Sequence, residues 1–216
     1  MNTNTTSVWR KKLKELEIVV VIPTYNNGKT LAAVIEEVYR HADDIIVIND
    51  GSTDDTANIL EQYPAIRTIT HPVNKGKGTA LKHGLSQAKK EGFRYAITID
   101  SDGQHFASDI PCFIEAIEKE PDTLLVGARN LASDNMPGKN TFANKFSNFW
   151  FRLETGLKLE DTQSGYRLYP LRKMDVQSCW YTAKYEFELE AIVFAAWGDV
   201  VVKNIPIHVY LSLIHI

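Results

Sequence analysis

Ile18-Val19-Val20-Val21-Ile22 is an unbroken apolar run that ends at Pro23. A run of this length without polar alternation is typical of a strand that is buried on both faces of a parallel sheet. A helical pattern follows at 31–38, and a second apolar run comes at 45–48. The alternation predicts parallel strands joined by crossover helices, and therefore an α/β fold with a mostly parallel central sheet flanked by helices.

The same alternation continues along the chain, which has 216 residues and 44% hydrophobic content and so fits a single core. We expect a polar N-terminal segment at 1–16, one domain at 17–210, and an atypical apolar end at 211–216 that we interpret as artificial. The further predicted elements are strands near 66–70 and 95–99, a helix at 80–88, a polar loop at 130–140, an aromatic-rich helix at 141–159, a polar turn at 161–167, a helix at 185–196, and short strands at 200–202 and 205–207.

The bulk properties exclude several classes of function. A net charge of -3 provides no basic field for nucleic acid. The two cysteines, Cys112 and Cys179, make no disulfide framework or zinc cluster and indicate a reducing compartment. The sequence has no signal-peptide run, and no apolar run approaches the roughly 20 residues that span a membrane. We expect a cytoplasmic protein, and the sequence allows a peripheral position at the inner face of the membrane.

Three predicted strands end in polar or Gly-containing segments, at Pro23–Asn27, Asn49–Asp54 and Asp100–His105. In parallel sheets, ligands bind outside the carboxyl ends of the strands. We therefore expect these three segments to converge on one crevice.

Asp100-Ser101-Asp102-Gly103-Gln104 places two carboxylates two residues apart at the end of a buried strand. Keeping both ionised is costly without a cation, and hard oxygen ligands suit Mg²⁺ or Mn²⁺, which also bind phosphate oxygens. Such a cation would stabilise the charge that develops on a leaving diphosphate. The structural alternative is an acidic loop that caps the next helix at Ser108 or Asp109.

Two more loops have a functional and a structural interpretation. Asp50 can accept hydrogen bonds from a nucleobase or a ribose, but Asp-Gly-Ser is also a common turn sequence. The segment Lys75-Gly76-Lys77-Gly78 resembles a phosphate cradle before a helix. The alternative interpretation is a lysine-rich loop. The segment is not a P-loop, and no Gly-x-Gly-x-x-Gly follows the first strand, which argues against a dinucleotide dehydrogenase.

The segment Asp161–Arg167 combines an acid, hydroxyl groups and an arginine. Asp161 can take a proton from an acceptor, and Arg167 can hold a phosphate by two hydrogen bonds. The alternative is an ordinary turn in which Arg167 pairs with a surface acid.

The helix predicted at 141–159 is rich in aromatic side chains and is most simply packed on the core. A membrane-facing helix is the alternative, because Lys145, Arg152 and Lys158 lie near the aromatic residues. The aromatic set is Phe142, Phe146, Phe149, Trp150 and Phe151.

Over about 18–209 the chain resembles family 2 glycosyltransferases of the GT-A fold, because three motifs occur in that family's order and spacing: Val21-Ile22-Pro23-Thr24-Tyr25-Asn26, Asn49–Asp54 and Asp100-Ser101-Asp102. Within the family it looks most like the dolichyl- or polyprenyl-phosphate sugar synthases. That likeness rests on Gly78–Gly84, Asp100–His105, Ser164-Gly165-Tyr166-Arg167-Leu168, and Phe187-Glu188-Leu189-Glu190 followed by Pro206-Ile207.

The resemblance implies inverting transfer of a sugar from a nucleoside-diphosphate sugar to an acceptor, with polyprenyl phosphate at a membrane surface favoured, and with Mg²⁺ or Mn²⁺ as cofactor. Asp102 and Asp161 are the candidate catalytic residues, with Asp161 as a base that only a hydroxyl acceptor needs. The implied nucleotide-sugar contacts are Pro23, Thr24, Tyr25, Ile48, Asp50, Lys77, Asp100 and Ser101; the metal ligands are Asp102 and Gln104; and the acceptor or phosphate contacts are Arg129, Ser164 and Arg167.

Other functions stay open at this point. One is transfer to a glycan or another hydroxyl acceptor in cell-envelope polysaccharide synthesis. Another is a non-catalytic nucleotide-sugar binder or a nucleotidyltransferase, which Thr24–Lys29 disfavours because it has one Gly and one Lys. Two features depart from the subgroup: Asn27 stands where an acid is usual, and 211–216 lacks its usual basic residues.

Overall fold

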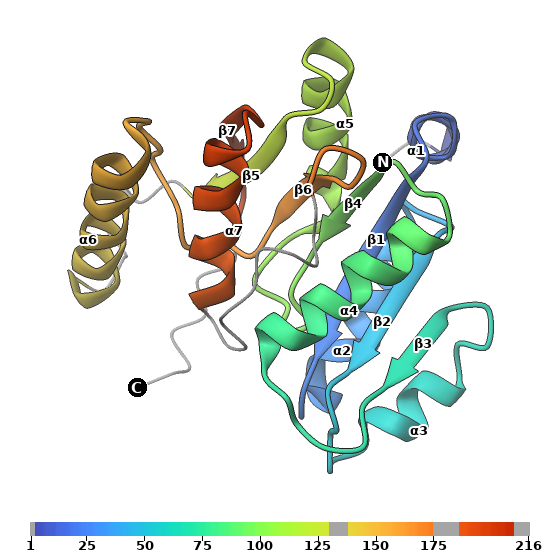
Figure 1. Ribbon diagram of the computed structural model, residues 1–216. Helices are drawn as coiled ribbons and strands as arrows, with labels where there is room; N and C mark the ends of the chain where they lie inside the picture. The colour runs from blue at the N-terminus through green and yellow to red at the C-terminus, as the bar shows by residue number, and fades with distance from the viewer. Residues whose placement is uncertain (1–2, 130–137, 175–185, 210–216) are drawn as a thin grey trace.

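The computed structural model describes residues 3–129, 138–174 and 186–209, and the side chains of 7–129, 146–174 and 186–209. Helices and strands alternate along most of the chain (Figure 1). The elements are α1 (Thr3–Glu15), β1 (Ile18–Thr24), α2 (Gly28–Tyr39), β2 (Ile45–Asn49), α3 (Thr56–Glu61), β3 (Arg67–Thr70), α4 (Lys77–Lys90), β4 (Tyr95–Thr98), the 3₁₀ turn η1 (Ala107–Asp109), α5 (Ile110–Lys119), β5 (Leu124–Arg129), α6 (Gly138–Thr155), β6 (Arg167–Pro170), α7 (Glu186–Trp197) and β7 (Val202–Ile207).

The strands of the described chain form one sheet in the order β3-β2-β1-β4-β6-β5-β7. β1 runs parallel to β2 and β4, β2 runs parallel to β3, and β5 runs parallel to β7. Only β6 is reversed, because it pairs antiparallel with both β4 and β5. The expected mostly parallel sheet flanked by helices is therefore confirmed, with one reversed strand that the sequence pattern did not reveal.

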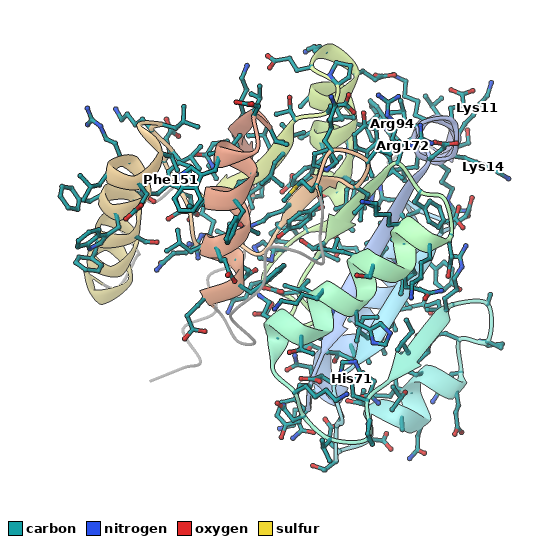
Figure 2. All side chains as sticks on the ribbon, viewed as in Figure 1. Lys11, Lys14, His71, Arg94, Phe151 and Arg172 are labelled. Carbon is teal, nitrogen blue, oxygen red and sulfur yellow. The ribbon has the colours of Figure 1, made fainter. Side chains whose placement is uncertain are left out.

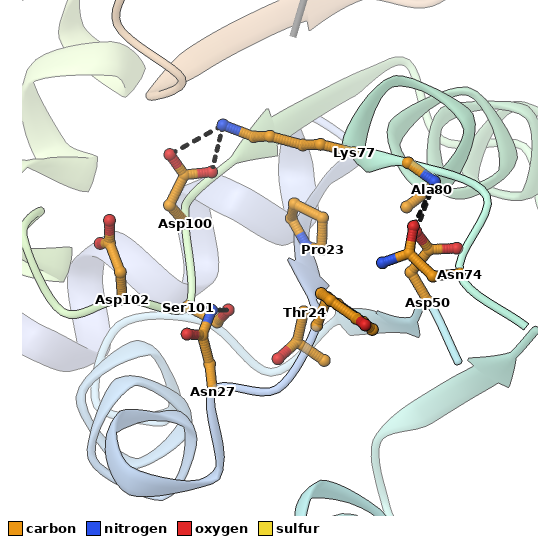
Figure 3. A pocket seen from close by; sticks show the side chains of 12 residues that line it. Pro23, Thr24, Asn27, Asp50, Asn74, Lys77, Ala80, Asp100, Ser101 and Asp102 are labelled. Carbon is orange, nitrogen blue, oxygen red and sulfur yellow. Dashed lines mark hydrogen bonds and ion pairs between the residues drawn. The ribbon is translucent and has the colours of Figure 1, made fainter. Parts of the chain in front are cut away.

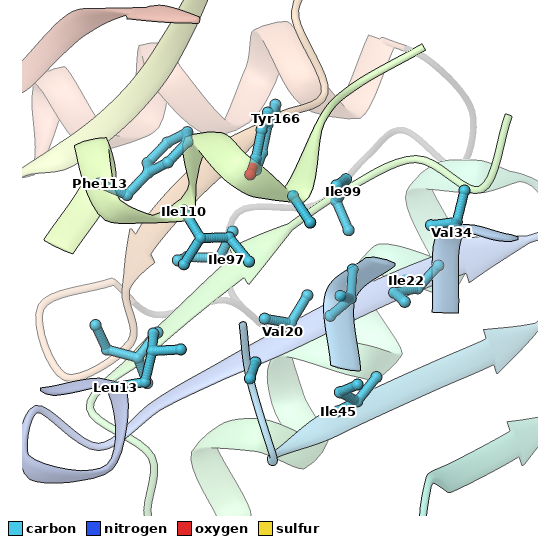
Figure 4. Close-up of a cluster of buried hydrophobic side chains, with 14 of the residues drawn as sticks. Leu13, Val20, Ile22, Val34, Ile45, Ile97, Ile99, Ile110, Phe113 and Tyr166 are labelled. Atoms are coloured by element: carbon cyan, nitrogen blue, oxygen red, sulfur yellow. The ribbon is translucent and has the colours of Figure 1, made fainter. Parts of the chain in front are cut away.

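The apolar side chains of β1 alternate between the two faces of the sheet, as the geometry of a strand requires. Ile18, Val20 and Ile22 pack on one face with residues of α1, α2 and α5, whereas Val19 and Val21 pack on the other with residues of α4 and α7. Figure 4 shows part of the first cluster, where side chains from α1, β1, β4 and α5 meet. Burying each such side chain contributes about 1.5–3 kcal/mol, so the sheet is firmly held between two helical layers.

The order in which successive strands are added to the sheet reverses at β1. The chain adds β2 and then β3 on one side of β1, and α4 returns it to β4 on the other side. Helix α4 lies close to the sheet, since a Cβ on Gly84 would come within 2.5 Å of Cγ1 of Val21. In such sheets the point of reversal opens a crevice at the carboxyl ends of the strands.

Several elements differ from their expected form. The N-terminal segment is a helix, α1, whose Leu13 belongs to the core and whose Trp9 packs against it. Strand β5 had no counterpart among the elements that the sequence pattern predicted, and the two short strands expected near the C-terminus are one strand, β7. The expectations for the loop at 130–137 and the end at 211–216 lie outside the described residues. Across the described part of the chain, no helix combines the length and apolar character needed to cross a membrane.

Candidate functional site

A pocket of about 470 Å³ opens at the carboxyl ends of β1, β2 and β4, beside the start of α4 (Figure 3). The three segments that were expected to converge all contribute to it. Its lining residues are Pro23, Thr24, Tyr25, Asn27, Asp50, Asn74, Gly76, Lys77, Ala80, Asp100, Ser101 and Asp102.

Hydrogen bonds join the loops after β1 and β2. The backbone N–H of Asn26 donates to Oγ of Ser52 at 3.0 Å, and the N–H of Thr53 donates to Oδ1 of Asn26 at 2.8 Å. Asp54 accepts from the N–H of Gly28, the first residue of α2, at 2.8 Å. The two loops therefore form one connected wall of the pocket.

Asp50 is 2% exposed, and three donors hold its carboxylate. The N–H of Lys75 lies 3.0 Å from Oδ1, the N–H of Gly76 lies 2.8 Å from Oδ2, and Nδ1 of His71 lies 2.6 Å from Oδ1. A carboxylate offers about four lone-pair directions, so one on Oδ2 remains for a ligand. Asp50 thus anchors the loop before α4 and keeps an acceptor at the pocket.

Two histidines extend this contact away from the pocket. Nε2 of His71 lies 2.9 Å from Nδ1 of His83, and the two rings stack with centroids 5.2 Å apart. Burial, followed by the neighbouring His71, lowers the pKa of His83. Figure 2 shows His71 on the side of the molecule where β3 ends and α4 begins. The pair braces the position of Asp50.

Lys77 links two carboxylates that come from distant parts of the chain. Its Nζ lies 2.8 Å and 2.9 Å from Oδ1 and Oδ2 of Asp100, and 3.2 Å from Oε1 of Glu188 on α7. Oε1 of Glu188 is buried and makes no hydrogen bond within the described chain, so its contact with Lys77 is an ion pair without hydrogen-bond geometry. One ammonium therefore serves two carboxylates.

Charge and burial oppose each other at this pair. Burial favours the neutral forms, but Asp100 and then Glu188 raise the pKa of Lys77 well above its ordinary value. Burial would likewise raise the pKa of Asp100, yet the Lys77 ammonium, followed by His105, holds that pKa below its ordinary value. Both groups are charged at neutral pH, and the pocket keeps a fixed pattern of charge.

The loop after β4 is tied to the start of α2. Ser101 is buried, its Oγ accepts from Nδ2 of Asn27 at 2.8 Å, and its carbonyl accepts from Oγ1 of Thr30 at 2.6 Å. Asp102 is exposed at the pocket, and its Oδ1 accepts from the N–H of Gln104 at 2.9 Å. The Gln104 side chain is exposed and does not line the pocket.

The predicted nucleoside contacts divide into two groups. Pro23 and Thr24 are buried at the pocket wall, Tyr25 is exposed there, and Oγ1 of Thr24 has no hydrogen-bond partner among the described residues. Ile48 instead lies in the core below the pocket, where it packs against Gly84. A ligand could satisfy Thr24, whereas the Ile48 side chain is out of reach.

The pocket offers oxygen ligands for a hard cation. Asp100 and Asp102 both line it, and no group of three or more His, Cys, Asp or Glu side chains that could hold a metal occurs in the parts of the chain that the structure describes. Mg²⁺ is commonly bound by one or two carboxylates together with substrate phosphates. The donor set therefore fits a cation whose coordination a bound phosphate completes.

The turn after α6 holds Asp161 in a closed arrangement. Asp161 is fully buried, and Nε and Nη2 of Arg129 lie 2.6 Å and 3.0 Å from its two oxygens. Its Oδ1 also accepts from the N–H of Gln163 at 2.9 Å. Asn204 on β7 donates to the carbonyls of Val126 and Asp161. Both oxygens of the Asp161 carboxylate thus already accept hydrogen bonds from the protein.

Arg167 and Ser164 are likewise buried. The guanidinium of Arg167 donates to the carbonyls of Ser164, Glu188 and Thr162, and it lines none of the described pockets. Oγ of Ser164 accepts from the N–H of Tyr166 at 3.3 Å. In this geometry both residues shape the turn and do not line the pocket at the ends of β1, β2 and β4, whereas Arg129 borders a second, open pocket with Lys158 and Lys203.

Three residues contribute to the site in ways that residue type and spacing did not predict. Glu188 reaches Lys77 only because α7 packs beside α4, and Asn27 was noted only as a departure from an expected acid. Gly165 has to lack a side chain, since a Cβ there would lie 2.7 Å from Oδ2 of Asp100, 2.8 Å from Oε1 of Glu188 and 2.9 Å from Nζ of Lys77. Its carbonyl is fixed by Oγ1 of Thr98 at 2.7 Å.

Helix α6 has one buried and one exposed aromatic side. Phe151 is 1% exposed and points toward α7 (Figure 2), as a helix packed on the core requires. The opposite side is exposed, and Phe142 lies outside the described side chains. The exposed apolar residues, 41% to 61% accessible, are Phe146, Phe149, Trp150, Leu153 and Leu157, together with Trp197 at the end of α7.

The chain is similar in sequence to one protein family and to several proteins of known name. The family described as Glycosyl transferase family 2 matches residues 19–176. A UDP-N-acetylglucosamine–dolichyl-phosphate N-acetylglucosaminyltransferase of Methanococcus voltae is 31% identical over 88% of this chain and 84% of its own length. A polyprenol monophosphomannose synthase of Mycolicibacterium smegmatis is 26% identical over 88% of this chain and 76% of its own length.

Solved structures with the same fold include glucosyl-3-phosphoglycerate synthase from Mycobacterium tuberculosis in complex with uridine diphosphate. It matches 96% of this chain and 76% of its own chain, with a TM-score of 0.70 and 20% identity. The same enzyme in complex with Mn²⁺, uridine diphosphate and glucosyl-3-phosphoglycerate gives a TM-score of 0.69. At this identity the likeness establishes the fold and nothing further.

Proposed function

Because the chain belongs to glycosyl transferase family 2 and has the expected GT-A fold, we propose that it transfers a sugar, with inversion, from a nucleoside-diphosphate sugar to a polyprenyl phosphate. Membership makes the chain a glycosyltransferase. The convergence of the β1, β2 and β4 loops on one charged pocket carries the donor half of the proposal. The names of the dolichyl- and polyprenol-phosphate relatives support the acceptor half.

The nucleoside would lie against the wall formed by the ends of β1 and β2. Pro23 and Tyr25 would provide its apolar surface, and Oγ1 of Thr24 would find a partner there. The remaining lone pair of Asp50 would accept from an N–H or O–H of the base or ribose, and Ser101 would lie beside the ribose.

The diphosphate would lie at the N-terminus of α4. Backbone N–H groups and the helix dipole favour an anion at that position, and Lys77 adds a positive charge. Asp102 would hold Mg²⁺ or Mn²⁺ beside Asp100, with phosphate oxygens completing the coordination, whereas the Gln104 side chain lies outside the pocket lining. The cation, when bound, would neutralise the charge of the leaving nucleoside diphosphate.

A phosphate acceptor is already an anion, so its oxygen can attack the anomeric carbon without a base. This chemistry suits Asp161, whose carboxylate is occupied by Arg129 and by the Gln163 amide. Asp161 would then orient Arg129 toward the acceptor phosphate, and Ser164 and Arg167 would fix the turn that carries Asp161. A hydroxyl acceptor would instead require Asp161 to leave this pairing.

A lipid acceptor would be reached at a membrane surface, and α6 suits that location. Its exposed aromatic side resembles the amphipathic face that lies in a bilayer interface, where Trp is favoured. Arg152 and Lys158 are exposed near this face and would meet anionic headgroups. We therefore propose a peripheral position at the inner face of the membrane, with α6 in contact with lipid.

Transfer itself tests the function. The protein is incubated with UDP-, GDP- and dTDP-sugars, with or without Mn²⁺, and with polyprenyl phosphate in vesicles or a soluble glycan. We expect a lipid-linked sugar from one donor class, only with the metal. A product on the glycan alone would support the hydroxyl alternative, and no product with any donor or acceptor would contradict the proposal.

A further inference from the structure

Lys77 places a positive charge where the proposed cation would have to act. Its ammonium contacts both oxygens of Asp100 (Figure 3), and Asp102 follows Asp100 by two residues on the same wall of the pocket. Glu188 contributes a further negative charge at 3.2 Å from Nζ. Asp100 and Glu188 therefore share one ammonium, and Asp102 is a third carboxylate on the wall of the same pocket.

A divalent cation beside Asp102 would change this balance. It would repel the ammonium, because like charges repel, and it would compete for Asp100, because a divalent cation attracts a carboxylate strongly in a partly buried site. Glu188 provides a carboxylate that the Lys77 ammonium can still contact after it leaves Asp100. Its Oε1 is buried and close to Nζ, and its contact with Lys77 is still without hydrogen-bond geometry.

We propose that Lys77 is an exchangeable counterion: it neutralises Asp100 before the donor binds, and passes to Glu188 and the donor diphosphate when the divalent cation arrives. Glu188 is then a positioning residue that holds the displaced ammonium. This inference rests on the proposed function, because it needs the cation and the donor. Gly165 permits the exchange, since a Cβ at that position would lie within 2.9 Å of atoms of all three side chains.

The test measures Mn²⁺ binding without nucleotide, from the electron paramagnetic resonance signal of free Mn²⁺ at pH 8. Lys77→Gln removes the competing charge, so it should bind Mn²⁺ about tenfold more tightly than the wild type. Glu188→Gln removes one of the two carboxylates that pair with the ammonium, so the ammonium should stay on Asp100, Mn²⁺ affinity should fall by roughly threefold, and this effect should shrink in the Lys77→Gln background. Lys90→Gln, which removes an exposed charge at the opposite end of α4, should behave as wild type.

In Lys77→Gln, binding of the nucleoside diphosphate should change in the opposite direction from binding of Mn²⁺. With Mn²⁺ saturating, Lys77→Gln should bind the nucleoside diphosphate more weakly than wild type, because the displaced ammonium no longer meets the diphosphate. If Lys77→Gln does not fold, Lys77→Arg carries the test. Its guanidinium can hold Asp100 by two hydrogen bonds, so Mn²⁺ should bind more weakly.

The outcomes separate the exchange from the function. Equal Mn²⁺ affinity in wild type and the Lys77 variants would overturn the exchange and leave a metal-dependent transferase standing. Equal effects of Glu188→Gln with and without Lys77 would also overturn it, since loss of negative charge alone would explain them. Failure of wild type to bind Mn²⁺, with or without nucleotide, would contradict the proposed cofactor as well.

Discussion

Asp161 accepts two hydrogen bonds from the guanidinium of Arg129, at 2.6 Å from Nε and 3.0 Å from Nη2, although Asp161 itself is fully buried. Breaking a buried pair by removing one partner costs about 3–5 kcal/mol, so this geometry is a stable one. Asn204 also fixes the backbone next to Asp161, because its Oδ1 accepts from the N–H of Glu160 at 2.6 Å. The pairing makes Asp161 the residue that best separates the two acceptor chemistries.

Asp161→Asn keeps the shape of the side chain and one acceptor oxygen for Arg129. With a phosphate acceptor, we expect kcat to fall by about tenfold or less, since only positioning is disturbed. With a hydroxyl acceptor, loss of a general base should reduce kcat by about 10²–10⁴-fold. The measurement compares kcat of both proteins with each acceptor class, and a loss of the larger size with polyprenyl phosphate would contradict a base-free attack.

Asp102→Ala should abolish the metal-dependent part of nucleotide binding, because it removes the exposed carboxylate of the pocket. Calorimetry with nucleoside diphosphate in the presence of Mn²⁺ and of EDTA measures that part directly. Asp55→Ala, an exposed acid outside the pocket lining, is the matched control. Unchanged nucleotide affinity of Asp102→Ala in Mn²⁺ would remove Asp102 from the cation site.

Gly165→Ala should disturb the charged cluster directly, since the new methyl group would meet Asp100, Glu188 and Lys77 at under 3.0 Å. We expect a stability loss of about 1–3 kcal/mol, as for other overpacked sites, and weaker nucleotide binding. Gly84→Ala is the comparison, because its clash is with Val21 in the core. If both variants bind nucleotide equally well at temperatures where both are folded, the close packing at Gly165 has no role in the site.

Replacing the exposed aromatic residues of α6 should weaken membrane binding. Phe149→Ser with Trp150→Ser removes two of its large exposed rings, which contact each other at 5.9 Å between centroids. Flotation with anionic vesicles should show a loss of bound protein of at least about tenfold, given the apolar area removed from the interface. Val73→Ser, at a residue that is equally exposed elsewhere, should bind as wild type. Equal flotation of all three proteins would remove α6 from the membrane contact.

The lowered pKa of His41 predicts that the protein loses stability in mild acid. Burial, followed by Arg10 and Arg40, lowers its folded pKa below 6.5, so the unfolded chain binds more protons as the pH falls through 6.5. Stability should therefore decrease from pH 7 toward pH 5, and His41→Gln should flatten that decrease. Urea unfolding at a series of pH values measures it.

His208 is the control for that series because its sign is opposite. Its hydrogen bond to Asp109 raises its folded pKa, so its contribution is present below pH 6.5 and is lost as the pH rises through the folded value. His208→Gln should make the acid loss of stability steeper. A slope unchanged in both variants would mean that these groups do not govern the acid limb.

The sheet and the place of the pocket could be predicted because they depend on local pattern. Apolar runs such as 18–22, followed by polar strand ends, are enough to bring Asp50 and Asp100 together at the point of reversal. The reversed strand β6 could not be predicted, because its four residues follow a polar turn and are buried by pairing with β4 and β5. Its direction is a property of the sheet, not of those four residues.

The partners of the charged residues are also long-range. Arg167 was expected to bind phosphate, but it is surrounded by three carbonyls, two of its own turn and one of α7. Lys77 and Glu188 are far apart in sequence and meet only because α4 and α7 pack on the same face of the sheet. Residue type and spacing indicate which groups can bind a phosphate or a cation, and packing decides which of them are already engaged.

The most direct test of sugar transfer to a lipid phosphate is the structure of the product. Protein, Mn²⁺, the preferred nucleotide-sugar and polyprenyl phosphate are incubated, and the lipid product is analysed by mass spectrometry and proton NMR. We predict one sugar joined through its anomeric carbon to the phosphate, with configuration opposite to that in the donor, and one nucleoside diphosphate released for each. A retained configuration, or a sugar joined to a hydroxyl group with polyprenyl phosphate left unmodified, would contradict it.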